Sequence, residues 1–223
     1  MPSTKCLALH LRAPLQSWGT ESKFTERTTG SFPAKSAVAG MICAAFGFPR
    51  GSEQERNFLC TFRRMHMLSA CRAGDDAGRR RSSRLVDFHT VENTPTANGS
   101  SKTTVTRRHY LTDAEFFVFL TGPQEIIESI RAALEDPVWG IWFGRKSCVP
   151  SAKVFWGIYD DQESGILDIF HGDKFLASED ATGFQDADFH ECDNPVSFDS
   201  EKRSYSLRHV KRVRAAGGGR HET

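Results

Sequence analysis

An alternating strand joined directly to an amphipathic helix is the feature that most restricts the fold of this chain. The segment DAEFFVFLT at 113–121 alternates apolar and polar side chains strongly enough for a central β-strand. A helix follows in PQEIIESIRAALEDP, with a proline at each end and five apolar residues on one face: Ile126, Ile127, Ile130, Ala133 and Leu134. The chain is therefore expected to pack a helix layer on a sheet.

A second strand and helix precede this pair. KCLALHLR at 5–12 alternates leucines with smaller or polar residues, the pattern of a half-buried strand. Pro33 suits the first position of a helix over 33–46, and Gly47 suits its C-terminal stop. Shorter strands are expected at 61–70, 154–158 and 204–210. This succession predicts an α+β sandwich of the ferredoxin type.

Two segments lack such patterns. Residues 74–108 are rich in Gly, Ser, Thr and Arg and too long for a plain connection, so we expect a projecting hairpin or a partly mobile arm there. The tail at 213–223 contains RAAGGGRHET and is predicted to be disordered.

Composition limits the class of protein. An apolar content of 39% and 17 phenylalanines suffice for one large or two small cored domains. The sequence contains no apolar run long enough to span a membrane and no secretion signal at its start, which predicts a cytoplasmic protein. Six cysteines are scattered without a CxxC pair, so we expect reduced, mostly buried thiols and neither a metal site nor a cofactor.

Charge is distributed unevenly along the chain. The net charge is +1, yet residues 1–112 hold 17 Lys/Arg against 8 Asp/Glu, whereas 113–223 hold 12 against 20. A chain divided in this way can present a basic face to a polyanion. Ordinary charge variation along a soluble protein is the alternative interpretation.

Four basic segments could line such a face. The first is the start of the 33–46 helix, where Lys35 and Ser36 beside free N–H groups resemble a phosphate seat; a surface lysine on a core helix is the alternative. The others are WGIWFGRKSCVP (139–150), RRRSSRLVDFHTV (79–91) and TVTRRHYLTDAEFF (104–117). Interleaved aromatic residues suit the stacked bases of single-stranded RNA, namely Trp18, Phe24, Phe32 and Tyr110.

An ordered set of motifs carries a family resemblance. These are LxLxxPLQSWG within 7–19, RTTGSFPAKSAVAGMICAAFG (27–47), DFHTV (87–91), RRHYLTDAEFFV (107–118) and FGRKSCVPSAKVFWG (143–157). Together they closely resemble the CasD family, the Cas-five-type subunits of the type I-E CRISPR surveillance complex Cascade, within the RAMP superfamily. The resemblance runs from residue 5 to about 158 and continues more weakly to about 212.

The resemblance implies a fold and a role. It implies a ferredoxin-like RAMP domain over 1–158 with a β-hairpin thumb at about 74–108, and a small C-terminal β region over 159–212. It implies a non-catalytic subunit for antiviral defence, which grips the 5′ handle of the CRISPR RNA (crRNA) and caps the backbone filament. Its partners would be crRNA, a CasC-type backbone subunit and a CasA-type large subunit, with target DNA reached only through the complex and no membrane.

Sixteen residues are expected to contact the RNA on this basis. They are Gln16, Trp18, Arg27, Lys35, Ser36, Arg80, Arg81, Arg84, His89, Arg107, Arg108, Tyr110, Gly144, Arg145, Lys146 and Ser147.

Other functions stay open at the level of sequence. A related Cas-five-type protein of type I-C systems is a metal-independent repeat endoribonuclease, and His89, His109, Tyr110 and Lys35 could in principle supply acid–base chemistry. A generic RNA-binding module outside CRISPR defence is a third possibility. The acidic stretch 160–200 favours solvent or a protein neighbour over RNA.

Overall fold

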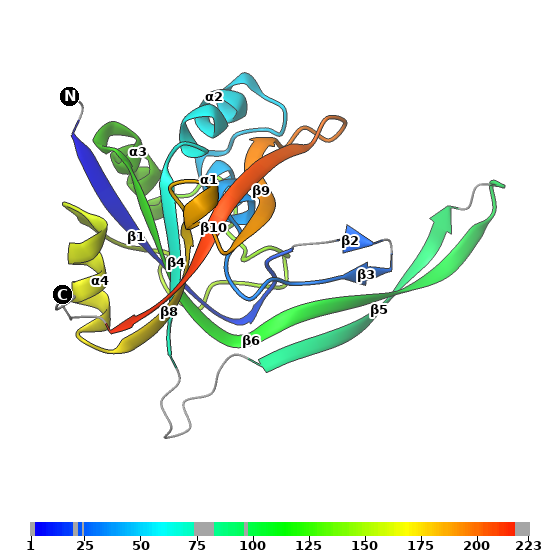
Figure 1. The fold of residues 1–223 in the computed structure, drawn as a ribbon. Helices are drawn as coiled ribbons and strands as arrows, with labels where there is room; N and C mark the ends of the chain where they lie inside the picture. The colour runs from blue at the N-terminus through cyan, green and yellow to red at the C-terminus, as the bar shows by residue number, and fades with distance from the viewer. Residues whose placement is uncertain (1–2, 20–21, 24, 74–82, 96–97, 217–223) are drawn as a thin grey trace.

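Strand β6 (Ser101–Pro123) is the axis of the sheet, with 23 residues in one continuous strand. The computed structural model describes residues 3–19, 22–23, 25–73, 83–95 and 98–216. The second half of β6 pairs on one side with β1 (Thr4–Gln16) and on the other with β4 (His66–Arg72), and β7 (Phe155–Tyr159) flanks β1. All these pairings are antiparallel, which gives the order β7-β1-β6-β4. Figure 1 shows β1, β6 and β4 of this order.

The C-terminal strands extend the same sheet. β8 (Lys174–Asp180) pairs with β4, β10 (Ser204–Ala216) pairs with β8, and β9 (Phe189–Ser197) pairs with β10. The region predicted at 159–212 therefore continues the sheet of the preceding residues. The prediction that the disordered tail begins at 213 is wrong, because positions 213–216 pair in register with β8; the remaining seven positions lie outside the described residues.

Helices cover both faces of the sheet. α1 (Lys35–Phe46) and α3 (Gln124–Glu135) pack on one face, over Leu7, Leu9 and Leu11 of β1. α4 (Gln162–Phe170) packs on the other face, over Cys6 and Ala8. The described fold is thus α+β, with the predicted helices and the strands at 5–12, 113–121, 154–158 and 204–210 confirmed. None of its described helices combines the length and apolar character that a bilayer crossing requires.

The predicted strand at 61–70 is only partly correct. Its first residues end α2 (Glu53–Phe62), and the strand starts at His66. Ser52 Oγ accepts a hydrogen bond from the N–H of Glu55, and Glu55 Oε2 accepts one from the N–H of Gly51. This reciprocal capping fixes the start of a helix that apolar periodicity alone does not reveal.

A long hairpin projects from the body of the molecule (Figure 1). β5 (Ser83–Pro95) pairs antiparallel with the first half of β6, from Ser83 opposite Thr112 to Pro95 opposite Ser101. The strand predicted at 113–121 and the second half of this hairpin are therefore one strand. Asp113, with φ of 51°, lies where β6 leaves the body.

Thiol burial is mixed. Cys6, Cys43 and Cys148 are buried, whereas Cys60 and Cys192 are exposed. Burial raises the pKa of Cys43 to about 12 and that of Cys6 to about 11. The buried thiols are thus held in the protonated, unreactive form.

A buried ion network fastens α1 to the C-terminal strands. Lys35 is 2% exposed, and its Nζ donates to Asp180 Oδ2 and to the carbonyl of Met65, both at 2.7 Å. Arg208, also buried, donates to Asp180 Oδ1 at 2.8 Å and to both carboxylate oxygens of Asp193. It also donates to Glu191 Oε2 at 2.7 Å.

The same network occupies the tip of α1. The backbone N–H of Lys35 donates to Asp193 Oδ2 at 2.7 Å. The predicted phosphate seat at Lys35 is therefore wrong, because carboxylates of β8 and β9 already occupy both its ammonium group and the first N–H of the helix. Burial lowers the pKa of Lys35, and the attraction of Asp180, which raises that pKa, offsets this effect only in part. Burial acts to raise the pKa of Asp180, but Lys35 and Arg208 outweigh it and hold that pKa below its ordinary value.

Removing one charge from this network should destabilise the protein strongly. We expect Lys35→Met and Asp180→Asn each to lower the free energy of unfolding by about 3 to 5 kcal/mol at pH 7, since each leaves a buried partner charge uncompensated. Lys5→Met is the control, because Lys5 pairs with the largely exposed Asp160 and should cost less than about 1 kcal/mol. Urea unfolding followed by circular dichroism measures all three, and equal losses would contradict a special role for the buried network.

The pH dependence of Asp180→Asn follows from the sign of the pKa shift. A carboxyl with a lowered folded pKa contributes its stability above its unfolded pKa of about 4 and loses it as the pH falls through the folded value. The stability gap between the wild type and Asp180→Asn should therefore shrink below about pH 4. A gap that stays constant down to about pH 2 would contradict the assignment.

Candidate nucleic-acid interface

The base of the hairpin is where three separate segments meet. β3 (Glu26–Arg27), which also pairs with β2 (Ser22–Lys23), runs parallel to β6, with Arg27 opposite Arg108. The N–H of Arg107 donates to the carbonyl of Thr25 at 2.7 Å. The 139–150 loop reaches this junction through Arg145.

Strand register divides the basic residues between two faces of the hairpin. Side chains directly opposite one another in paired strands share a face, as do residues two apart in one strand. Arg27, Arg108 and Tyr110 therefore lie on one face, and His89 lies further along the same face. Five residues share the opposite face: Glu26, Val86, Phe88, Arg107 and His109.

Arg145 completes the first of these faces. Its Cζ lies 4.5 Å from the centroid of the Tyr110 ring, a cation–π contact. Its Nη1 donates to the carbonyl of His109 at 3.2 Å, and its Nη2 donates to the carbonyl of Arg27 at 3.0 Å. We call Arg27, Arg108 and Arg145, arranged around Tyr110, the arginine face.

The arginine face contains one acidic residue, Asp87, which lies directly opposite Arg108 in the hairpin. Within the described ranges, none of its three arginines forms an ion pair. Arg108 Nε and Thr104 Oγ1, which share this face, are buried polar atoms without a hydrogen-bond partner. Both groups therefore keep hydrogen-bonding capacity that the described residues do not use. Sequence reasoning missed Thr104, although its spacing of two residues from Thr106 and four from Arg108 could have assigned it to this face.

The 143–148 turn positions two further polar residues. Lys146 and Ser147 are exposed, and Lys146 Nζ lies 5.8 Å from the centroid of the Trp142 ring. Gly144 has φ of +98°, and a Cβ there would lie 1.8 Å from the carbonyl oxygen of Ser17. A side chain at position 144 would therefore clash with the residue that follows β1. This clash accounts for the glycine, so the predicted close approach to RNA is not needed to explain it.

Three predicted contact residues belong to the interior. Gln16 is fully buried, and its Nε2 donates to the carbonyls of Leu11 and Ala114. Trp18 donates from Nε1 to Gln16 Oε1 and packs on Phe143. Tyr110 is 5% exposed beneath Arg145. The prediction that RNA bases stack on Trp18 and Tyr110 is therefore wrong, because both rings are covered by the protein.

The remaining predicted residues lie elsewhere. Arg84 Nη2 donates to Ser31 Oγ at 3.2 Å, and Arg107 stacks on Phe88 on the opposite face of the hairpin. Ser36 lies half-buried beside Lys35 in the first turn of α1. Arg80, Arg81 and Phe24 lie outside the described residues.

Comparison with known proteins identifies similar chains. Residues 6–211 match the family model described as CRISPR-associated protein (Cas_Cas5). The CRISPR system Cascade subunit CasD of Escherichia coli (strain K12) is 29% identical over 160 residues, which cover 68% of this chain and 70% of that protein.

Two solved structures are similar over almost the whole chain. A chain of a CRISPR RNA-guided surveillance complex superposes with a TM-score of 0.75 and 26% identity, covering 95% of this chain and 90% of that one. A structure described as a Cas protein superposes with a TM-score of 0.66 and 26% identity, covering 95% of each chain.

The glycine at 144 offers a test of how the loop is held against β1. We expect Gly144→Ala to lower the free energy of unfolding by about 3 kcal/mol, because it adds a clash with Ser17 to the strain of a positive φ. Gly172→Ala is the matched control: its φ is +89° and nothing lies near the added methyl, so it should cost about 1 kcal/mol. Equal losses in denaturant unfolding would show that backbone strain alone matters at Gly144.

Proposed function

Because the chain belongs to the Cas5 family of CRISPR-associated proteins, we propose that it binds guide RNA within a Cascade-type surveillance complex. The observation that carries this proposal is the arginine face at the base of the hairpin. Among the described residues, none of its three guanidinium groups forms an ion pair, and Arg108 Nε and the nearby Thr104 Oγ1 have no hydrogen-bond partner. Phosphate oxygens of an RNA strand would satisfy both the charges and the donors.

The subunit role extends the family assignment. We assign this chain to the type I-E kind of complex, where it grips the 5′ handle of crRNA and caps the backbone filament. Its neighbours are a CasC-type backbone subunit and a CasA-type large subunit. Six elements between β1 and β7 form a β-α-β-β-α-β set, namely β1, α1, β4, β6, α3 and β7, and their strands lie in the order β7-β1-β6-β4. This arrangement supports a ferredoxin-like RAMP core with the β5–β6 hairpin as its thumb.

A non-catalytic role fits the positions of the candidate acid–base groups. His89 lies opposite Thr106 in the hairpin and His109 lies opposite Val86, three register positions away, so the two imidazoles occupy opposite faces. His109 Nε2 hydrogen-bonds to Glu26 at 3.1 Å. Lys35 is enclosed in its ion network. General acid–base cleavage needs such groups within hydrogen-bond reach of one phosphodiester, and this arrangement does not gather them.

Charge reversal on the arginine face should weaken guide binding. We expect the double variant Arg27→Glu/Arg108→Glu, assembled with the other complex subunits, to lose at least tenfold in affinity for crRNA. The dependence of affinity on salt should also become shallower, because fewer counter-ions are displaced from the RNA. Filter binding across a salt series measures both quantities.

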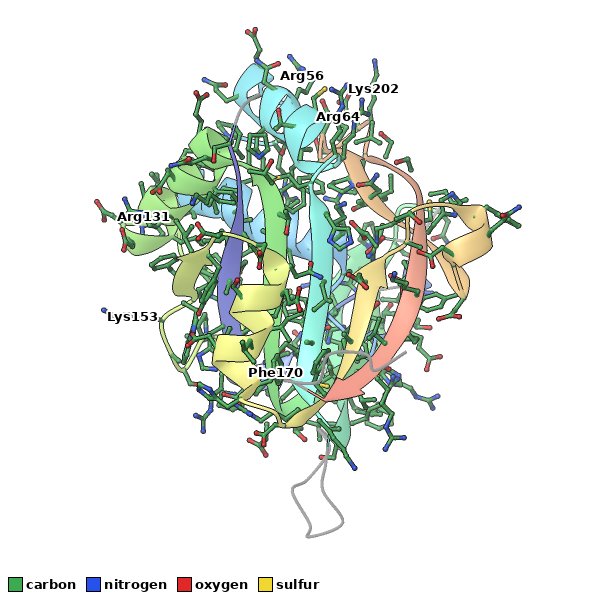
Figure 2. All side chains as sticks on the ribbon, turned by 60° about the vertical axis from the view of Figure 1, so that its left-hand side comes forward. Arg56, Arg64, Arg131, Lys153, Phe170 and Lys202 are labelled. Atoms are coloured by element: carbon green, nitrogen blue, oxygen red, sulfur yellow. The ribbon has the colours of Figure 1, made fainter. Side chains whose placement is uncertain are left out.

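The control for this experiment is a double variant that also replaces two cations by glutamates, but on another surface of the protein. Figure 2 shows Arg64 and Lys202 together at the α2 end of the body. Both side chains are exposed, so Arg64→Glu/Lys202→Glu should bind crRNA as the wild type does. Equal effects of the two double variants would contradict the arginine face as the RNA site.

The absence of nuclease activity is tested separately. Incubation of the purified protein with repeat RNA in EDTA should leave the RNA intact. Discrete cleavage that disappears in His89→Ala or His109→Ala would overturn the non-catalytic proposal in favour of an endoribonuclease.

A further inference from the structure

The sheet face that carries α4 is covered by that helix only in part. Phe170 of α4 is fully buried and packs on Phe117 of β6, over Cys6 and Ala8 of β1. His10 follows on the same face of β1, beyond the apolar cluster under α4. Figure 2 labels Phe170 at the end of α4 and Lys153 at the edge of the molecule.

An aromatic group stands at this uncovered end. The His10 ring stacks on Phe117, with centroids 4.8 Å apart and planes at 11°. Trp156 meets both rings nearly at right angles, with centroids 5.3 Å away in each case. Trp156 is nevertheless 47% exposed. Its indole is held in one orientation by protein while much of its surface stays open, which preorganises it for stacking.

A hollow of about 420 Å³ opens beside this indole. His10, Ala152, Lys153, Phe155 and Trp156 line it. A smaller hollow of about 190 Å³, lined by residues that include Arg12, Asp113 and Ser151, adjoins the same 151–153 segment. The volume of the larger space falls within the range of small-ligand sites, and its lining combines aromatic surface with a cation.

The charge of the lining selects the occupant. Lys153 and Arg12 form no ion pair within the described part of the chain. Arg12 belongs to the smaller hollow, where it lies directly opposite Glu115 in the β1–β6 pairing and shares the lining with Asp113. Glu115 also hydrogen-bonds to His10 at 2.7 Å. Lys153 is therefore the cation of the larger hollow, and an aromatic slot with this cation in its lining fits a planar base that carries a phosphate better than it fits an uncharged peptide.

We propose that this hollow, the Trp156 slot, binds one nucleotide of a single-stranded nucleic acid. The base stacks on Trp156, and the phosphate lies near Lys153. The slot lies on residues separate from the arginine face and goes beyond the guide-binding role given above. The strand could come from RNA or from DNA, because stacking and phosphate binding do not distinguish the two sugars.

The test uses the purified full chain carrying Arg27→Glu/Arg108→Glu, which reverses two of the three charges of the arginine face. Fluorescence anisotropy is measured with labelled eight-nucleotide oligo(U) and oligo(dT). In this background we expect Trp156→Ala to weaken binding about tenfold, the loss typical of one stacked base. Trp156→Phe, which keeps a ring, should retain most of the affinity and shows that the site is folded.

Matched controls come from the same chain. Trp139 is 44% exposed and lies outside the slot, so Trp139→Ala should bind as the background does. Lys153→Glu should weaken binding, whereas the equal charge change Lys202→Glu should not. Tighter binding of oligo(U) would identify RNA as the source of the nucleotide, and tighter binding of oligo(dT) would identify DNA; both support the slot.

Two results would overturn the proposal. One is equal affinity for Trp156→Ala and Trp139→Ala, including the case in which the background binds neither oligonucleotide. The other is unchanged oligonucleotide binding by Trp156→Ala together with loss of a neighbouring subunit on co-purification, which would make the slot a protein contact. Failure of the arginine-face experiment would not affect these comparisons, because each compares two variants in the same Arg27→Glu/Arg108→Glu background.

Discussion

The buried network of Lys35, Asp180, Asp193 and Arg208 is the interaction on which the rest of the structure depends. It joins the first turn of α1 to β8, β9 and β10, elements more than 140 residues away along the chain. Burial acts against the charged form of Arg208, but Asp193 and Asp180 raise its pKa, so all its partners face a permanent cation. Because such a network stabilises only when complete, it fixes the position of the C-terminal strands relative to α1.

This network bears on where the proposed RNA site lies. Its carboxylates occupy the ammonium group of Lys35 and the first N–H of α1. We therefore propose the base of the hairpin as the RNA site, because its three arginines form no ion pair with a described residue. There, Arg145 joins the 139–150 loop to β3 and β6 through two carbonyls and the ring of Tyr110. The interface is thus built on paired strands and a clamped turn, which hold the guanidinium groups more firmly than a free loop would.

The fold was predictable from sequence where one face of an element is apolar. The alternation at 5–12 and 113–121 and the helix at 124–135 correspond to β1, β6 and α3, because burial on one side imposes those periods. The roles of Lys35 and Trp18 were not predictable in this way. The sequence around a lysine at a helix tip is the same whether the side chain faces solvent or pairs with a distant residue such as Asp180. The burial of Trp18 likewise depends on packing against Phe143, which is far away along the chain. The arginines of the hairpin base were identified from sequence, but their division between two faces required the strand register.

The most direct measurement is photocrosslinking of the assembled complex, with 4-thiouridine in the 5′ handle of crRNA and mass spectrometry of the crosslinked peptides. Crosslinks are expected on peptides that contain Arg27, Arg108 or the 145–147 turn. Crosslinks concentrated on the 33–46 helix instead, with none at the hairpin base, would contradict RNA binding by the arginine face.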